Sequence, residues 1–192
     1  MIHLPGRRVI GKHSVRLQGL SDLFLHAPGA SVLDVGCNRG VQLYDMYLHG
    51  ARLLHGIDLA PDAIENARAL FADEVGAQCQ FEVGDLTRGA AALAPFGDGG
   101  YDIVMMIATY HKLARAPSKP YQELGAKGMT AQELSDFMRH LGSRTQKFFA
   151  FKAPNMDAFG QVDRDLSDAG LKRIATSAIC SIGPAGIWRR GD

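Results

Sequence analysis

The sequence predicts an α/β domain built on a doubly wound, seven-stranded and mostly parallel sheet. Segments typical of buried strands alternate with segments whose apolar residues recur at helical spacing, which is the order of a parallel sheet covered by helices on both faces. The last two expected strands are joined by a turn at Gly183-Pro184 with no helix between them, so they predict an antiparallel pair at one edge. A chain of 192 residues, 46% hydrophobic and 21% charged, fits a single globular domain with its own core.

Each element has its own signal in the sequence. The segment 101–107 is apolar almost throughout, as expected for a strand buried on both faces. Pro61 suits the first turn of a helix that has apolar residues on one face, and Thr130 with Glu133 forms the pattern of a capping box. Gly170 is placed to end the last helix. The expected strands are 31–36, 53–58, 80–84, 101–107, 147–151, 171–180 and 186–190, and the expected helices are 40–48, 61–71, 87–93, 130–141 and 159–169.

The first thirty residues are expected to form a separate N-terminal segment, and residues 31–192 the main domain. Residues 15–26 have helix-like spacing, so this segment is expected to be helical. We also expect it to lie near the ligand-binding site. The basic residues of this segment are followed by no continuous apolar stretch, so they are not expected to form a secretory signal. The apolar run 103–108 is far shorter than a membrane span of roughly 20 residues. Three cysteines without ligand-like spacing predict neither a disulfide framework nor a metal site. We therefore expect a soluble, cytoplasmic protein without membrane contact or metal.

The ends of the expected strands carry the residues of chemical interest, because ligands of such sheets bind outside the carboxyl ends of the strands. After the first strand, Gly36 and Gly40 allow a ligand to approach the backbone, and Asp34 is a carboxylate inside an apolar strand that requires partners. Asp58 ends the second strand, where it can accept hydrogen bonds from a ribose diol, and Asp85 ends the third. These residues also have a structural interpretation. The glycine turn would then only connect a strand to a helix, and Asp58 and Asp85 would cap the helices that follow them.

These motifs, taken in order, resemble those of the class I S-adenosylmethionine-dependent methyltransferases. The segments that carry the resemblance are 32–40, 56–68, 84–86 and 101–104, and it extends over roughly residue 31 to the C-terminus. The resemblance implies a Rossmann-like fold and S-adenosyl-L-methionine as the cofactor. It places Gly36 and Gly40 beside the methionine portion, Asp58 at the ribose and Asp85 with Leu86 at the adenine. The further cofactor residues that it implies are Asp34, Cys37, Asn38, Leu59 and Ile107. Asn38 stands where the family often has glycine, and asparagine tolerates positive φ better than most residues.

Tyr110 and His111 follow the fourth strand, where the family's acceptor approaches the methyl group. The motif Asn/Asp-Pro-Pro-Tyr/Phe of amino-methylating members and a Pro-Cys nucleophile are both absent from the sequence. A histidine can remove a proton from a hydroxyl, so His111 and Tyr110 are the candidate catalytic residues. The alternative is that both residues form a wall of the cofactor pocket. A loop from 113 to 128 with Lys112, Arg115, Lys119, Tyr121 and Lys127 is the candidate acceptor lid or, alternatively, ordinary solvated charge.

The sequence thus predicts a methyltransferase that O-methylates a small molecule or sugar. The alternative acceptor is RNA, for which Trp188 beside Arg189 could stack on a base, although 21 basic against 20 acidic residues give no overall basic character. A protein of another class, a partner subunit that binds S-adenosylmethionine without catalysis, has the same motifs. A nicotinamide enzyme is disfavoured because the third glycine of its fingerprint is missing.

Overall fold

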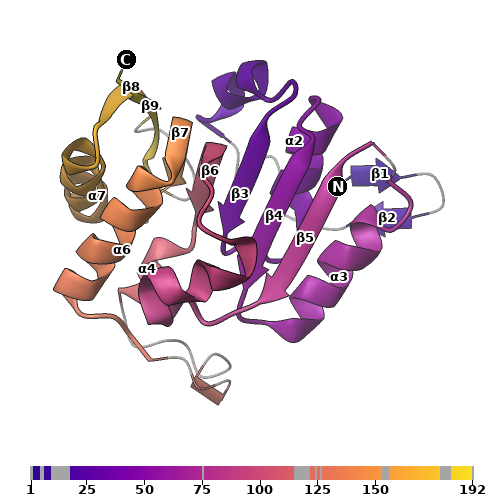
Figure 1. Cartoon of the computed structure of the whole chain (residues 1–192), viewed down its shortest axis with the longest axis horizontal. Coiled ribbons are helices and arrows are strands. Elements are labelled where there is room, and N and C mark those ends of the chain that lie inside the picture. The colour runs from indigo at the N-terminus through magenta and orange to yellow at the C-terminus, as the bar shows by residue number, and fades with distance from the viewer. Residues whose placement is uncertain are drawn as a thin grey trace.

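The computed structural model contains one large sheet with helices on both faces (Figure 1). It describes residues 2–4, 7–9, 18–74, 76–114, 122–123, 125, 127–152, 156–177 and 183–191. The strands are β1 (Ile2–Leu4), β2 (Arg7–Val9), β3 (Ser31–Val35), β4 (Leu53–Asp58), β5 (Gln78–Val83), β6 (Tyr101–Ile107), β7 (Thr145–Lys152), β8 (Leu171–Ser177) and β9 (Ala185–Arg190). The helices are η1 (Ser21–His26), α2 (Val41–Leu48), α3 (Pro61–Phe71), η2 (Leu86–Phe96), α4 (Tyr110–Leu113), α6 (Ala131–Ser143) and α7 (Met156–Asp168), of which η1 and η2 are 3-10 helices.

The large sheet confirms the predicted fold class. Its order is β5-β4-β3-β6-β7-β9-β8, with β3 to β7 parallel and β9 antiparallel to both of its neighbours. The antiparallel pair of β8 and β9 lies at one edge, as expected, and β9 is inserted between β7 and β8. The strands that follow β3 in sequence, β4 and β5, lie on one side of it, and β6 and β7 lie on its other side. In this topology the ligand crevice lies between β3 and β6, at the carboxyl ends of these two strands.

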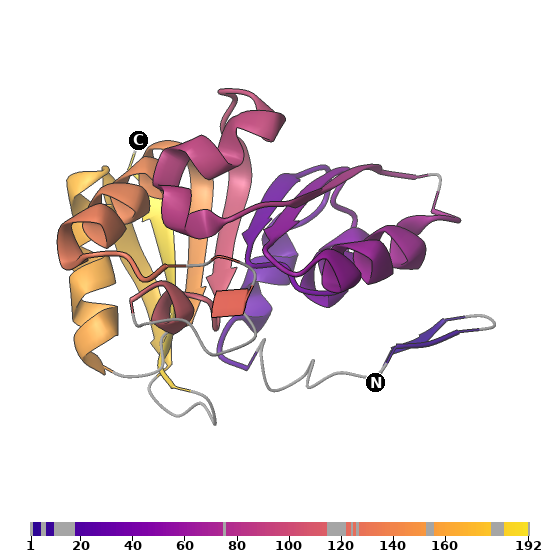
Figure 2. The same cartoon turned by 90° about the horizontal axis from the view of Figure 1, so that it is seen from below.

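Two apolar cores lie on opposite faces of the sheet (Figure 2). One contains residues of η2, α4, α6 and α7, and the other contains residues of η1, α2 and α3. The side chains of β6 contribute alternately to both cores: Val104 and Met106 to the first, Ile103 and Met105 to the second. The continuous apolar character of this strand follows from burial on both faces.

The predicted capping signals are present in the structure. Thr130 Oγ1 accepts a hydrogen bond of 3.2 Å from the backbone N–H of Glu133, whose carboxylate accepts one of 2.8 Å from the backbone N–H of Thr130. Gly170 follows α7 with a φ of +83°, as a C-terminal cap requires. The expected helix at 87–93 is instead a longer 3-10 segment with a kink at Gly89, whose φ of +60° and ψ of −136° are not helical.

The N-terminal segment contributes both strand and 3-10 helix to the described structure. β1 and β2 pair in an antiparallel two-stranded sheet. Of the helix expected at 15–26, residues 15–17 lie outside the described residues, and residues 21–26 form the 3-10 helix η1. Leu20, Leu23 and Ala27 are buried in the core with α2 and α3. Residues from 20 onward therefore pack as part of the main domain.

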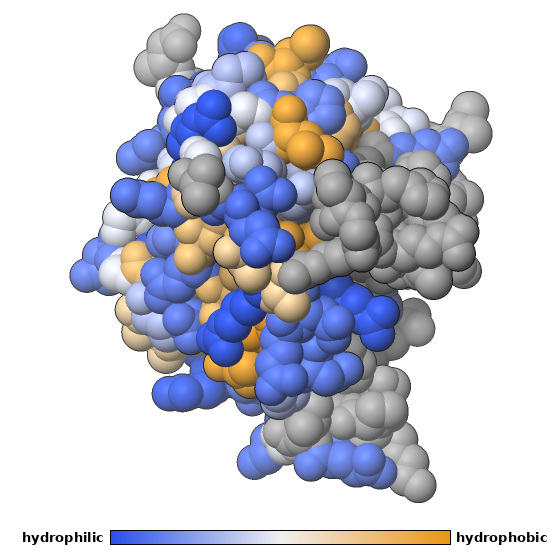
Figure 3. Space-filling view, turned by 90° about the vertical axis from the view of Figure 1, so that its right-hand side faces the viewer, coloured by the Kyte–Doolittle hydropathy of each residue, from blue (hydrophilic) through white to orange (hydrophobic). Residues whose placement is uncertain are grey.

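The described surface mixes apolar and hydrophilic side chains. Figure 3, which views the molecule from the β5 side, shows small apolar areas interrupted by hydrophilic residues. None of the described helices is long and apolar enough to cross a membrane.

Candidate functional site at the carboxyl ends of the strands

The loop after β3 is folded against the end of β4. The backbone N–H groups of Gly36 and Cys37 both donate to the carbonyl of Ile57, at 2.9 and 3.0 Å. Gly36, Asn38 and Gly40 have φ values of +88°, +50° and +71°, so the loop turns through three left-handed residues. Asn38 adopts the positive φ that its residue type tolerates, and the loop keeps this shape without a glycine there.

Gly36 is in close contact with the end of β6. A Cβ atom at Gly36 would lie 2.1 Å from Thr109 Oγ1, so a side chain cannot be accommodated there. Ala108, which precedes this threonine, has a φ of +57°, a strained conformation for a residue with a side chain. Such outliers cluster at functional sites, and here the turn brings Thr109 against the glycine loop.

Asp58 connects the loop to the end of β4. Its Oδ2 accepts a hydrogen bond of 3.0 Å from the backbone N–H of Asn38, and its Oδ1 accepts one of 3.1 Å from the N–H of Ala60. The side chain is 4% exposed. An ionised carboxylate has about four lone-pair sites, so each oxygen retains the capacity to accept a further bond from a ligand hydroxyl.

Asp34 and Cys37 lie beneath this loop. Asp34 is buried in β3, where it pairs in register with Gly56 of β4 and Met105 of β6. Burial raises the pKa of the Cys37 thiol well above its usual value, and the nearby carboxylates of Asp34 and Asp58 raise this pKa further. The thiol therefore stays protonated and serves as a packing group, since the thiolate is the nucleophilic form.

Asp85, which follows β5, caps the helix η2. Its Oδ1 accepts hydrogen bonds from the backbone N–H and the hydroxyl of Thr87, at 2.9 and 2.7 Å. Leu86 is buried among the apolar residues of η2, Leu59 is half-buried, and Ile107 is buried at the end of β6. The structure thus brings the predicted cofactor residues to one edge of the sheet, and the capping geometry that we expected as an alternative is present at Asp85.

Tyr110 and His111 form the first turn of α4, directly after Thr109. Tyr110 is buried, with its ring packed edge-on against Phe151 of β7, and His111 is half-buried. Burial raises the pKa of the Tyr110 phenol, and the charge of Asp165 raises this pKa further. The phenol therefore remains protonated at neutral pH. Of the lid residues, Arg115, Lys119 and Tyr121 lie outside the described residues.

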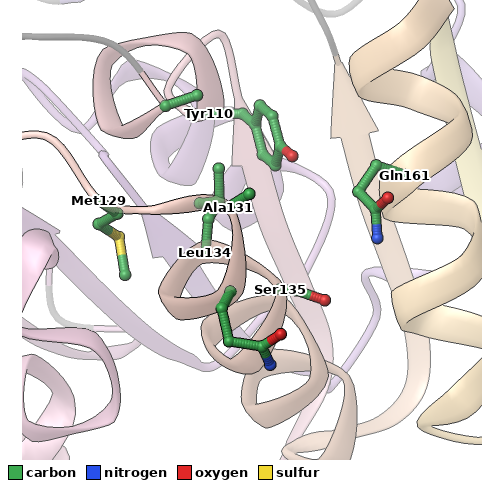
Figure 4. Close-up of a pocket in the computed structure, with 8 residues that line it drawn as sticks. Tyr110, Met129, Ala131, Leu134, Ser135 and Gln161 are labelled. Atoms are coloured by element: carbon green, nitrogen blue, oxygen red, sulfur yellow. The ribbon is translucent and has the colours of Figure 1, made fainter.

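A cavity of about 350 Å³ lies beside Tyr110, between α4, α6 and α7 (Figure 4). In Figure 4 the hydroxyl of Tyr110, the hydroxyl of Ser135 and the amide of Gln161 face the same space. The other lining residues are Ala114, Met129, Ala131, Gln132 and Leu134. The volume falls at the lower end of the range of small-molecule sites.

Two of the basic and aromatic residues near the C-terminus, Trp188 and Arg190, are used within the fold. Trp188 is fully buried, and its Nε1 donates a hydrogen bond of 2.8 Å to Asp163 Oδ1, so the expectation that it stacks on a base is wrong. The reason is that its ring faces α7, where it packs against Phe159, whereas Arg189 on the same strand is exposed. The Arg190 guanidinium donates to the backbone carbonyls of Thr145, Ala169 and Gly142 and is used within the fold. Among the described residues, no group of three or more His, Cys, Asp or Glu side chains is arranged to hold a metal ion.

The comparison with protein families identifies the stretch of the chain that contains this site. The family described as "Methyltransferase domain" matches residues 32–125, the stretch that contains the glycine loop, Asp58, Asp85 and the end of β6. The chain is an S-adenosylmethionine-dependent methyltransferase. S-Adenosyl-L-methionine is the methyl donor of this family, and the match covers all ten residues predicted to hold it.

Solved structures agree with this methyltransferase in fold. Magnesium protoporphyrin IX methyltransferase from Synechocystis PCC 6803, with bound S-adenosylmethionine, is 17% identical, with a TM-score of 0.64 over 97% of this chain and 87% of that chain. N-Methyltransferase NodS from Bradyrhizobium japonicum WM9 is 14% identical, with a TM-score of 0.64 over 92% and 95% of the two chains. A ribosomal protein L11 methylase from Lactobacillus delbrueckii subsp. bulgaricus is 14% identical, with a TM-score of 0.61 over 92% and 78%. No curated protein sequence matches significantly.

Three residues at or near the candidate site were not singled out by the sequence analysis. Thr109 and Ala108 have no local signal, because their importance comes from contact with Gly36 and from backbone conformation. Asp165 did have a signal, since it is a carboxylate one residue before Leu166 in the apolar stripe of α7. A charged residue on a buried helix face requires partners, which is a reason to examine its surroundings.

Proposed function

We propose that this methyltransferase O-methylates a small molecule or sugar, with Asp34, Gly36, Cys37, Asn38, Gly40, Asp58, Leu59, Asp85, Leu86 and Ile107 forming the cofactor site. The observation that carries the proposal is the closure of the loop after β3 on both neighbouring strand ends. The loop is bonded to Asp58 and to the Ile57 carbonyl on one side, and it packs against Thr109 on the other. A loop fixed on both sides presents its backbone at the ligand crevice of the sheet.

The residues present fit the cofactor. Gly36 has no space for a Cβ, so the backbone there is as close to its neighbour as glycine permits. The carboxylate of Asp58 is held by two backbone N–H groups and retains lone pairs for the ribose hydroxyls. When bound, S-adenosylmethionine supplies an electrophilic methyl group on its sulfonium. The chain's own task is to hold an acceptor in line with that methyl group, which is mainly a matter of position.

We assign proton removal from the acceptor to His111, with Tyr110 beside it. Both residues follow the turn at Ala108 and Thr109, and Tyr110 lines the adjacent cavity. The protonated phenol of Tyr110 is a hydrogen-bond donor toward that cavity. A small acceptor is favoured by the size of the cavity, and RNA is disfavoured by the burial of Trp188. We also propose residues 31–192 as the catalytic domain, the N-terminal segment 1–30 as its neighbour at the site, and a cytoplasmic location.

The proposal is tested by calorimetry with S-adenosylhomocysteine and NAD, followed by a methyl-transfer screen. We expect S-adenosylhomocysteine to bind and NAD not to bind. Radiolabelled methyl groups from S-adenosylmethionine should then appear in one group of a panel of hydroxylated metabolites, and not in RNA. Binding of S-adenosylhomocysteine with no transfer to any metabolite, protein or RNA fraction would favour the non-catalytic partner instead.

A further inference from the structure

A second cavity lies at the edge of the sheet opposite to the proposed cofactor site. Its volume is about 480 Å³, which is within the range of small-molecule sites. Its walls are residues of η2, of the turn before β6 and of the end of α6, next to the first residues of β6 and β7. The cofactor motifs follow the last residues of the parallel strands, so this cavity is separate from them.

Arg144 lines this cavity and is 7% exposed. Its Nε and Nη2 donate hydrogen bonds of 2.9 and 2.5 Å to the carbonyl of Gly99, and the guanidinium lies 5.4 Å from the centre of the Tyr101 ring. A guanidinium has five N–H groups, so three remain. Nη1 donates no hydrogen bond within the described chain, and it is not one of the fully enclosed atoms that lack a partner. It therefore retains accessible surface, which we place at the cavity that the residue lines.

The charge of Arg144 has no carboxylate partner. The ion pairs among the residues that the structure describes are formed by other side chains. Burial lowers the pKa of His140, the charge of Arg144 lowers it further and the charge of Asp98 opposes both, so these groups share one environment. Asp98 is exposed, however, and a solvated carboxylate offsets little of the cost of a buried cation. A charge buried to this extent is costly unless it is paired.

The end of α6 does not supply the missing acceptor. A helix C-terminus is partly negative and favours a cation such as Arg144. Its carbonyls are occupied, because that of Gly142 accepts a hydrogen bond from the Arg190 guanidinium. The carbonyl of His140 accepts one of 2.7 Å from the Ser143 hydroxyl. A ligand is therefore the remaining source of an acceptor for Nη1.

The wall that η2 contributes to the cavity is apolar. Its residues are Ala90, Ala91, Leu93 and Ala94. Small side chains leave space there, and their methyl groups can pack against a short aliphatic group. Since the exposed Asp98 lines the same cavity, one negative charge on a ligand fits better than two.

We propose that this cavity, defined here as the Arg144 cavity, binds a small monocarboxylate with a short aliphatic chain. The carboxylate accepts hydrogen bonds from Nη1 and from the remaining N–H of Nη2, because the planar guanidinium matches two carboxylate oxygens. The aliphatic chain packs on the alanines of η2. The inference goes beyond the proposed function and does not rest on it, since the two sites lie at opposite edges of the sheet.

Four compounds with the same alkyl chain serve as probes: butyrate, butyramide, butylamine and butyl phosphate. Saturation-transfer NMR at millimolar probe concentration, in a buffer free of other carboxylates and of phosphate, compares their binding. We expect butyrate to bind best, because butyramide lacks the charge, butylamine has the wrong sign and butyl phosphate carries more than one negative charge. Equal binding of butyramide would remove the charge from recognition and overturn the proposal. Preference for butylamine or butyl phosphate would overturn it as well.

Arg144→Gln and Arg144→Lys test the guanidinium. In R144Q the affinity for butyrate should fall at least about tenfold, since charge-assisted hydrogen bonds are lost. R144K keeps the charge without the planar fork, so its affinity should lie between those of R144Q and the wild type. Wild-type affinity for butyrate in folded R144Q would refute the role of Arg144.

Two matched variants test the cavity without changing Arg144, whose bond to Gly99 also supports the fold. Ala94→Leu fills the Arg144 cavity and should abolish butyrate binding. Ala131→Leu makes the same change at the cavity beside Tyr110 and should leave it intact. The opposite result, with binding lost in A131L and kept in A94L, would place the carboxylate in the other cavity and refute the proposal.

Binding of S-adenosylhomocysteine separates this inference from the proposed function. It should be unchanged in R144Q and A94L, because both substitutions lie at the other edge of the sheet. If the wild type binds butyrate but not S-adenosylhomocysteine, this inference stands and the proposed function fails. If it binds S-adenosylhomocysteine but not butyrate, the function stands and this inference fails.

Discussion

Asp58→Ala separates a ligand-binding role of Asp58 from its role in the loop. The carboxylate accepts two backbone hydrogen bonds, from Asn38 at 3.0 Å and from Ala60 at 3.1 Å. Hydrogen bonds to charged groups contribute about 1.5–3 kcal/mol each, and both donors are only half-buried, so water replaces part of what is lost. We expect the free energy of unfolding to fall by roughly 2–3 kcal/mol, measured by urea denaturation.

The same substitution should weaken cofactor binding. If Asp58 also holds the ribose hydroxyls, the affinity for S-adenosylhomocysteine should fall roughly 10- to 150-fold, measured by calorimetry. An analogue without the 2′- and 3′-hydroxyls distinguishes direct contact from loop distortion. The wild type should discriminate against this analogue by a similar factor, and D58A should not, because the partner of the hydroxyls is gone.

A helix cap outside the proposed cofactor residues provides the control for D58A. Thr130→Ala removes the N-cap of α6 and should lower stability by about 0.5–2 kcal/mol without altering ligand affinity. The reasoning is refuted if folded D58A binds S-adenosylhomocysteine within threefold of the wild type, or if it still discriminates against the analogue. Asp58 would then serve the loop alone.

Three further substitutions have expected outcomes. Gly36→Ala should destabilise the fold by about 2–4 kcal/mol in urea, because the new Cβ would lie 2.1 Å from Thr109 Oγ1 at a φ of +88°; an unchanged unfolding midpoint would show that the loop can move away. Burial raises the pKa of Asp45 from 3.8 to about 6, so the folded state retains a proton that the unfolded chain loses, and stability falls as the pH rises from about 4 to 6. Asp45→Asn should remove this slope and raise the free energy of unfolding at pH 7.5 by about 1–2 kcal/mol, and a variant that keeps the wild-type pH profile would assign the slope to other groups. His111→Gln should bind S-adenosylmethionine normally and lose turnover about 10²- to 10⁴-fold once an acceptor is known; full turnover with the same pH profile would make His111 a pocket wall.

The parallel strands and their helices could be predicted because each has a local cause. The bounds of β4, α3 and β6 agree with the expected segments 53–58, 61–71 and 101–107, since apolar runs, Pro61 and flanking turn residues are all adjacent in sequence. The kink at Gly89 in η2 was not predicted. Glycine can adopt a positive φ anywhere, and its surroundings decide whether it does.

The cavity beside Tyr110 could not be predicted in the same way. The cofactor motifs could be recognised because each is a short stretch of sequence at the end of a single strand: the glycine loop follows β3, and Asp58 is the last residue of β4. This cavity is formed by residues of α4, α6 and α7 and of the segments beside them. Next to it, Asp165 of α7 accepts a hydrogen bond from Ser135 of α6, thirty residues earlier in the sequence. Sequence shows that Asp165 is out of place on an apolar stripe, but its partners depend on how α6 and α7 pack. Trp188 was misassigned for a related reason, because its burial depends on how α7 packs over β9, which has no local signal in the sequence.

One turn of backbone at the end of β6 serves both halves of the site. The left-handed conformation of Ala108 sets the direction of the next two residues. Thr109 packs against Gly36, on the side of the proposed cofactor site, and Tyr110 packs against Phe151 and lines the cavity proposed for the acceptor. Strain of this kind persists where the surrounding structure holds it, and here the contacts of both neighbours do so. If the cofactor and the acceptor bind as we propose, the distance between them is set by this turn, and this suits a transfer whose rate depends on alignment.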